Sequence, residues 1–147
     1  MTTTSKSAPL SVWRPIATDT FLVSSPHYPE HVDESYWQRD ADRMAAAGFN
    51  VVRLAEFALH ITEPREGTFD FDLFDHAIEV LGKAGLKIIM CTPTATPPRW
   101  LTARYPEVLR VDANGHAMSH GSRQHANLAS GVYREHSKRI TKAMAEQ

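Results

Sequence analysis

A short segment occurs twice in the chain, and this repeat limits the possible folds more than any other feature. Residues 47–52 read Ala-Gly-Phe-Asn-Val-Val, and residues 84–89 read Ala-Gly-Leu-Lys-Ile-Ile. In each copy an amphipathic helical pattern ends at a glycine, and a β-branched run follows directly. Helix, glycine stop and strand in this order form a β/α unit. The repeat therefore predicts an α/β fold with parallel strands and right-handed crossovers.

Apolar periodicity and turn residues place the other elements. Strands are expected at 21–23, 51–54 and 86–90, and helices at 33–47, 71–84, 98–104 and from Gly131 or Val132 to the end. Asp33 and Ser130 are the predicted N-caps of the first and last helices. Residues 56–70 are expected to form a loop, and 108–111 a short strand that ends in a turn at 112–115. The polar residues 1–15 predict a flexible tail before a domain that covers residues 16–147.

A rigid polar segment follows the third expected strand. Residues 92–101 read Thr-Pro-Thr-Ala-Thr-Pro-Pro-Arg-Trp-Leu. Each of the three prolines fixes its own φ and favours an extended conformation in the residue before it. In α/β folds, ligands bind at the carboxyl ends of the strands. This loop is therefore the predicted ligand side of the domain.

Composition excludes several classes of partner. The net charge is −1, which gives no support to binding of nucleic acid or of an acidic membrane surface. No apolar stretch approaches the ~18 residues of a membrane span, and the N-terminus shows no apolar signal segment. The single cysteine, Cys91, cannot form an intrachain disulfide, and we expect it to be packed as a small apolar side chain. These features predict a cytoplasmic location.

The number of expected strands is small for a complete α/β domain. Three parallel strands leave two open edges, whereas a flavodoxin-like sheet has about five strands and a (β/α)8 barrel has eight. We therefore expect the chain to form the first part of a larger domain. A complete small α/β domain is the alternative. A nucleotide-binding domain is disfavoured because the sequence has neither G-x-G-x-x-G nor a phosphate loop.

Five motifs in order along the chain resemble the N-terminal part of glycoside hydrolase family 42. They are the proline loop 92–101, Tyr-Pro-Glu-His at 28–31, Leu-Ala-Glu-Phe-Ala at 54–58, Glu-Pro-Arg-Glu-Gly-Thr-Phe-Asp-Phe at 63–71 and Gly-Ser-Arg-Gln-His at 121–125. Members of this family are mostly bacterial β-galactosidases built on a (β/α)8 barrel. The resemblance implies that this chain forms about three β/α units of such a TIM barrel.

The resemblance also implies which reaction the family catalyses, and it implies that the catalytic residues lie outside this segment. Family members hydrolyse terminal β-D-galactosides with retention, which needs two carboxyl groups about 5–5.5 Å apart. The family carries its acid/base glutamate in an Asn-Glu pair after strand four and its nucleophile after strand seven. No Asn-Glu pair occurs here, so we expect no catalytic residue within these 147 residues and no activity of this segment alone. The alternative is a non-catalytic sugar-binding or subunit-interaction module that assembles with a separate remainder.

Only one substrate contact transfers from the family to this chain. The arginine of the 121–125 motif binds galactose in family members, and that position is Arg123. Some members hold zinc through cysteines, one of which aligns with Asn127, so we expect neither metal nor cofactor here. Val32 and Leu59 stand where the family usually has tryptophan. Trimers are common in the family, and a trimer is possible for the full-length protein.

Several other residues have a functional and a structural interpretation. Glu56 and Glu63 could form a catalytic pair, although a supporting or helix-capping role is favoured for Glu56. His116, His120 and His125 could bind a metal, but their spacing is not a standard zinc pattern, so surface or hydrogen-bonding roles are favoured. His125 is the one we expect to support the site. Trp100 could stack on a sugar, yet anchoring of the short helix is favoured because Leu101 beside it is apolar.

Overall fold

The computed structural model describes residues 20–121 and 124–147, so the predicted tail at 1–15 lies outside the described residues. Three strands form one sheet: β1 (Ser24–Pro26), β2 (Val51–Leu54) and β3 (Lys87–Met90). The longer helices are α1 (Trp37–Ala46), α3 (Asp72–Lys83), α4 (Arg99–Arg104) and α5 (Gly131–Glu146). Four short helical turns complete the order: η1 (Pro29–His31), η2 (Glu34–Tyr36), α2 (Leu59–Thr62) and η3 (Pro106–Val108).

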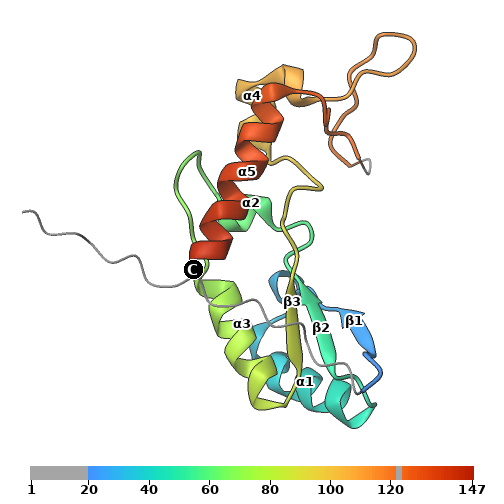
Figure 1. Cartoon of the computed structure of the whole chain (residues 1–147), viewed down its shortest axis with the longest axis vertical. Helices are drawn as coiled ribbons and strands as arrows, with labels where there is room; N and C mark the ends of the chain where they lie inside the picture. The colour runs from blue at the N-terminus through green and yellow to red at the C-terminus, as the bar shows by residue number, and fades with distance from the viewer. Residues whose placement is uncertain (1–19, 122–123) are drawn as a thin grey trace, which may run out of the picture.

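The sheet is parallel, with the strand order β1-β2-β3. Alternate side chains of β2 and β3, such as Val52 and Ile88, point toward α1 and α3, which lie together on one face of the sheet (Figure 1). Ala41 of α1 and Phe74 and Leu81 of α3 are buried in this main core. The predicted α/β architecture with repeated β/α units is confirmed.

The two glycine stops have the same backbone conformation. Gly48 has φ +86° and Gly85 has φ +82°, in the left-handed region that L side chains rarely adopt. Each lets the chain leave a helix and turn directly into the next strand. The sequence echo at 47–52 and 84–89 therefore corresponds to one structural device used twice.

The first strand lies three residues later than expected. The Asn50 side chain binds the predicted strand residues instead, since its Oδ1 accepts from the Val23 amide (2.9 Å) and its Nδ2 donates to the Phe21 carbonyl (2.8 Å). This side chain occupies ladder positions that a neighbouring strand would need. Regular pairing with β2 then begins at Ser24.

Three further boundaries differ from expectation. Asp33 does cap a helix, but its carboxylate accepts from the Ser35 amide of η2, and α1 begins only at Trp37. The expected loop 56–70 contains the helical turn α2. The expected strand 108–111 is absent from the structure, where η3 is followed by two isolated bridges, from Leu109 to Ala126 and from Val111 to Ala117. A ladder needs a continuous partner, and here two different segments each supply one residue.

The region after β3 has a small core of its own. Leu101 of α4, Val108, Ala126 and Tyr133 of α5 are buried together. The predicted Ser130 cap is confirmed, because its hydroxyl accepts from the Tyr133 amide at 3.3 Å. This second core packs α4, η3 and α5 together in the part of the molecule that lies beyond the carboxyl ends of β2 and β3 (Figure 1).

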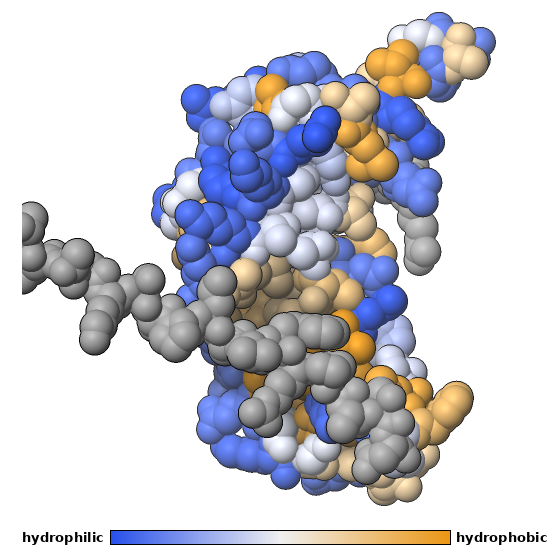
Figure 2. Space-filling view, in the orientation of Figure 1, coloured by the Kyte–Doolittle hydropathy of each residue, from blue (hydrophilic) through white to orange (hydrophobic). Residues whose placement is uncertain are grey.

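The sheet face opposite the helices is only partly covered by the described residues. Ile89 of β3 is 42% exposed, and Phe21, Leu22 and Val23 before β1 are also exposed. Figure 2 shows apolar surface gathered around the sheet in the lower part of the molecule, whereas the region of α4 and α5 is largely hydrophilic. A parallel sheet that is covered by helices on one face and partly open on the other is the geometry expected of the first β/α units of a barrel.

Candidate functional site

The proline loop is fixed by contacts with elements on both sides of it. The Thr94 carbonyl accepts a hydrogen bond from the Tyr133 hydroxyl of α5. The Thr96 hydroxyl donates to the Phe57 carbonyl after β2, at 3.4 Å. Pro97 and Pro98 are buried. The loop therefore owes its position to cross-links as well as to proline stiffness, and its threonines serve partly to hold it in place.

A cavity of about 570 Å³ opens beside this loop. Its walls come from the segments that follow β2 and β3, from the 110–129 region and from α5. The lining residues include Glu56, Phe57, Thr96, Arg110, Asn127 and Tyr133. This size and mixed lining suit a small polar ligand such as a sugar ring. We refer to it as the first cavity.

Glu56 is held in the first cavity by two neighbours. The Arg53 guanidinium lies 2.8 Å from Oε2, and the Tyr28 hydroxyl donates to the same oxygen at 3.3 Å. Just before it, Ala55 has φ +67°, a strained conformation for a residue with a side chain, and it is fully buried. This turn directs the chain out of β2 at the carboxyl end of the strand. The supporting role expected for Glu56 agrees with these contacts, but helix capping is wrong, because α2 has no side-chain cap.

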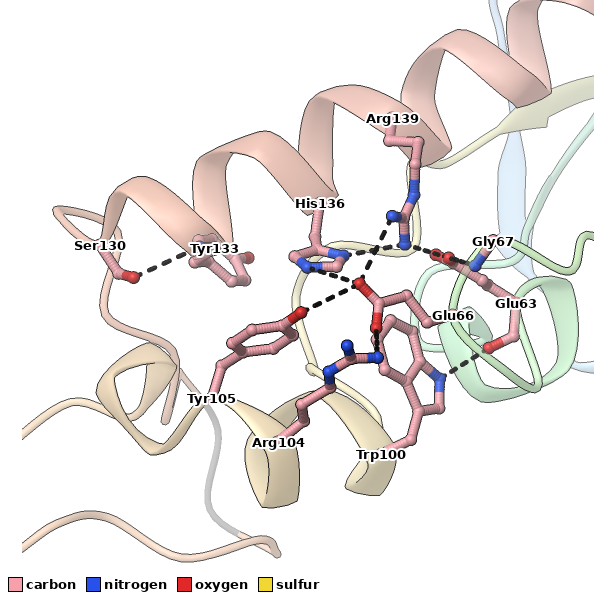
Figure 3. Close-up of polar contacts among 10 residues, drawn as sticks. All are labelled: Glu63, Glu66, Gly67, Trp100, Arg104, Tyr105, Ser130, Tyr133, His136 and Arg139. Atoms are coloured by element: carbon pink, nitrogen blue, oxygen red, sulfur yellow. Dashed lines mark hydrogen bonds and ion pairs between the residues drawn. The ribbon is translucent and has the colours of Figure 1, made fainter.

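Glu63 faces a different environment. Its side chain is 1% exposed and lies against α5, where it forms an ion pair with Arg139 and accepts from the Gly67 amide at 2.7 Å (Figure 3). Glu63 does not line the first cavity. The interpretation of Glu56 and Glu63 as a catalytic pair is therefore not supported by their surroundings.

A polar cluster extends from Glu63 along α5, and Figure 3 shows its members converging between α5, α4 and the segment before α3. Glu66 accepts from Arg104 (2.5 Å) and Tyr105 (3.2 Å). His136 receives a hydrogen bond on Nδ1 from Arg139 at 2.8 Å, and its Nε2 lies 3.6 Å from Glu66. Arginine can only donate, so His136 Nδ1 accepts and the ring proton is on Nε2. Burial, followed by the charge of Arg139, lowers the pKa of His136.

Trp100 anchors α4, as expected from its apolar neighbour. Its indole N–H donates to the Glu63 carbonyl at 2.8 Å, and its ring meets His136 edge-on at 5.5 Å. These contacts fix the ring between α4 and the loop before α3. One side of Trp100 still lines a second cavity, of about 530 Å³, on the other side of Phe57 and Thr96.

The three histidines do not assemble a metal site. His116 is exposed, and its Nδ1 lies 3.5 Å from Oδ2 of Asp112, the first residue of the predicted turn. His120 binds the Thr102 hydroxyl at 2.7 Å, and its ring is 5.1 Å from that of His125, which is 2% exposed. Within residues 20–121 and 124–147, no cluster of three metal-ligating side chains occurs. Burial, followed by the electrostatic effects of the neighbouring His125 and Arg99 side chains, lowers the pKa of His120.

The structure describes most, but not all, of the residues that the family resemblance singles out. Arg123 lies outside the described residues, although Gln124 beside it lines the first cavity. Asn127 binds its own loop, because its Oδ1 accepts from the Ala129 amide at 3.1 Å. Cys91 is partly buried, and burial raises the pKa of its thiol, so it remains protonated at neutral pH. Leu59, which replaces a usual tryptophan, is buried.

Sequence reasoning missed part of the cavity wall. Arg110 and Leu128 line the first cavity, yet neither belongs to one of the motifs. Tyr133 falls within the expected last helix without a predicted role, although its hydroxyl holds the proline loop. A buried tyrosine usually has a hydrogen-bond partner, and that rule was the available signal. In the described part of the chain, no helix is long and apolar enough to cross a membrane.

Comparison with known proteins agrees with the geometry. The glycoside hydrolase family 42 model, described as β-galactosidase, matches residues 26–147. The chain is 44% identical to β-galactosidase Bga of Halorubrum lacusprofundi and 46% identical to a β-galactosidase of Thermus thermophilus, in each case over 121 residues and 82% of this chain. These alignments cover 17% and 19% of the two relatives, so the chain spans less than a fifth of their length.

Solved structures give the same result. The β-galactosidase of Halorubrum lacusprofundi superposes with a TM-score of 0.81 at 42% identity, and that of Marinomonas ef1 with 0.81 at 40% identity. Each superposition covers 86% of this chain and 19% of the other protein. The three parallel strands with their helices are thus the N-terminal β/α units of a TIM barrel. The chain belongs to glycoside hydrolase family 42, the β-galactosidase family.

Proposed function

We propose that this chain supplies the first β/α units and one wall of the sugar site of a retaining β-galactosidase, which hydrolyses terminal β-D-galactosides. The observation that carries the proposal is the first cavity at the carboxyl ends of β2 and β3, in a chain that belongs to this family. Ligands bind at that edge of a barrel. Arg123, next to the cavity residue Gln124, is the proposed galactose contact, because a guanidinium offers several fixed donors to sugar hydroxyls.

We further propose that a polypeptide of these 147 residues does not catalyse hydrolysis. Retaining hydrolysis needs an acid/base and a nucleophile, both carboxyl groups. Among the described residues that line the first cavity, Glu56 supplies the only carboxylate, and it is bound to Arg53 and Tyr28. One engaged carboxylate cannot perform both roles.

Two measurements test these proposals. Purified chain is mixed with a chromogenic β-galactoside, and turnover clearly above buffer would contradict the proposed inactivity. Ligand-observed NMR then compares methyl β-D-galactoside with methyl β-D-glucoside. Preferential binding of the galactoside, lost in Arg123→Ala and retained in the exposed control Arg43→Ala, is expected. Equal signals for the two sugars would contradict a galactoside site.

A second candidate function rests on the open sheet. Ile89 is 42% exposed, and β1 and β3 are the two edges of the sheet that the described residues form. A module that assembles with a separately made remainder would cover these edges. Co-expression with the rest of a family 42 barrel is expected to give a soluble complex with galactosidase activity. Separate elution of the two parts without activity would argue against assembly.

A further inference from the structure

The second cavity differs in charge from the first. Its nine lining residues include Arg99, the histidines His60 and His120, the aromatic rings of Phe57 and Trp100, and three prolines. Among these described residues none is an aspartate or a glutamate. The first cavity, by contrast, contains Glu56.

The carboxylates near the second cavity are bound elsewhere. Glu63 pairs with Arg139, and Glu66 pairs with Arg104. None of the ion pairs formed by the described residues includes Arg99. The cavity therefore presents a guanidinium that has no carboxylate partner among the described residues.

The two cavities adjoin each other. Phe57 and Thr96 line both, so they form the partition between them, and the Thr96 hydroxyl is hydrogen-bonded to the Phe57 carbonyl. A ligand bound in the first cavity and extending past this partition would enter the second. The prolines and the anchored Trp100 keep the second cavity preformed, which lowers the cost of ordering it around a ligand.

We propose that the second cavity binds an oxyanion on the sugar unit next to the galactosyl residue, with the Arg99 guanidinium as its main partner. This inference rests on the proposed function, because it takes the first cavity as the galactosyl site. A guanidinium binds carboxylate or sulfate through two parallel hydrogen bonds. The preferred substrates are then galactosides whose leaving sugar carries a uronate carboxylate or a sulfate ester.

The environment of His120 supports the same conclusion. Its ring lines the cavity, its Nε2 binds Thr102 of α4, and the charged or titratable groups near it are Arg99, His125 and, across the cavity, His60. Repulsion by His125 and Arg99 adds to the effect of burial in lowering the pKa of His120. A bound anion would offset this repulsion. Binding should therefore raise the pKa of His120, which gives a readout independent of affinity.

The test uses purified chain and ligand-observed NMR titrations with D-glucuronate, D-glucose 6-sulfate, D-glucose and inorganic sulfate. The charged sugars are expected to bind about fivefold more tightly than glucose, because a charge-assisted hydrogen bond is stronger than a neutral one by about 1 kcal/mol, which corresponds to about fivefold in Kd. Arg99→Ala should remove this preference, and Arg99→Lys should keep part of it. Arg43→Ala, which removes one exposed positive charge on α1, is the matched control.

The outcomes separate this inference from the proposed function. Glucuronate and glucose binding equally, with galactoside binding intact, would overturn the oxyanion site alone. Inorganic sulfate binding as tightly as the charged sugars would also overturn it, because the cavity would then not recognise the sugar. Arg99-dependent binding of a charged sugar without any galactoside binding would support the second cavity and contradict the proposed function. A His120 pKa unchanged by saturating glucuronate would count against Arg99 and His120 sharing one site.

Discussion

The ion pair between Arg139 and Glu63 joins α5 to the segment before α3, and its removal should be costly. The Glu63 side chain is 1% exposed, and in Arg139→Ala its carboxylate keeps only the Gly67 amide as a hydrogen-bond donor among the described residues. Breaking a buried pair costs about 3–5 kcal/mol. The Arg139 side chain is 35% exposed, so water reaches the pair and we expect a lower cost, about 2–3 kcal/mol.

Two comparisons separate the charge effect from the effect of side-chain packing. Glu63→Gln keeps the shape and leaves Arg139 able to reach water, so it should cost about 1 kcal/mol. In the double variant Glu63→Gln/Arg139→Ala, no buried charge is left unpaired, and its cost should be less than the sum of the single costs by about 1 kcal/mol or more. Arg134→Ala, an exposed position on the same helix, should change stability by less than about 0.5 kcal/mol.

Urea unfolding followed by circular dichroism measures these differences. The order expected is Arg139→Ala as the most destabilised, followed by Glu63→Gln and then Arg134→Ala. If Arg139→Ala unfolded at the same urea concentration as Arg134→Ala, the ion pair would not stabilise the fold. Strict additivity in the double variant would show that the cost of Arg139→Ala came from packing rather than from the stranded carboxylate.

Three further predictions concern stability. Burial and the neighbouring Arg139 guanidinium lower the pKa of His136, so the unfolded chain binds a proton at this side chain more readily than the folded chain does. The free energy of unfolding should therefore fall as the pH drops below about 6.5, the ordinary pKa of histidine. Urea titrations at several pH values should show a smaller fall in His136→Gln. Gly85→Ala should destabilise by about 1 kcal/mol through its positive φ, whereas Gly82→Ala within α3 should stabilise by a similar amount, and equal signs in thermal melts would contradict this. Tyr133→Phe should cost about 1 kcal/mol by leaving the Thr94 carbonyl without its donor, and an unchanged melting temperature would show that the bond contributes nothing.

Features set by neighbouring residues were predictable from the sequence. Gly48 and Gly85 mark helix ends because few other residues adopt their φ values, and their repetition indicated the β/α unit. The apolar faces of α1 and α3 followed from helical spacing, and Ala41 and Phe74 are indeed buried. The Ser130 cap was predictable for the same reason, because its hydroxyl binds the Tyr133 amide only three residues later. In each case the physical cause lies within a few residues of the signal.

Features set by contacts between distant segments were not predictable in this way. The β1 boundary depends on the side chain of Asn50, which lies 27 residues beyond Val23. Glu63 was placed in an isolated loop, whereas Arg139, 76 residues later, holds its carboxylate. The positive φ of Ala55 has no sequence signal, because alanine carries no preference for it. The wall of the first cavity depends on the same kind of distant contact, since it joins Glu56 and Thr96 to Arg110 and Tyr133, which lie far from them in the sequence.

Helix α5 connects the stability of the chain to the geometry of the first cavity. Tyr133, in its first turn, holds the proline loop and lines the first cavity, whereas Arg139 holds the segment before α3. Six residues of helix place these two side chains about 9 Å apart along one rigid rod. The Arg139 ion pair therefore gives α5 a second point of attachment, on the same rod as Tyr133. The pair lies outside the first cavity, yet it holds the helix that forms part of the cavity wall, which gives a physical reason to retain a charged pair where an apolar pair would be simpler to bury.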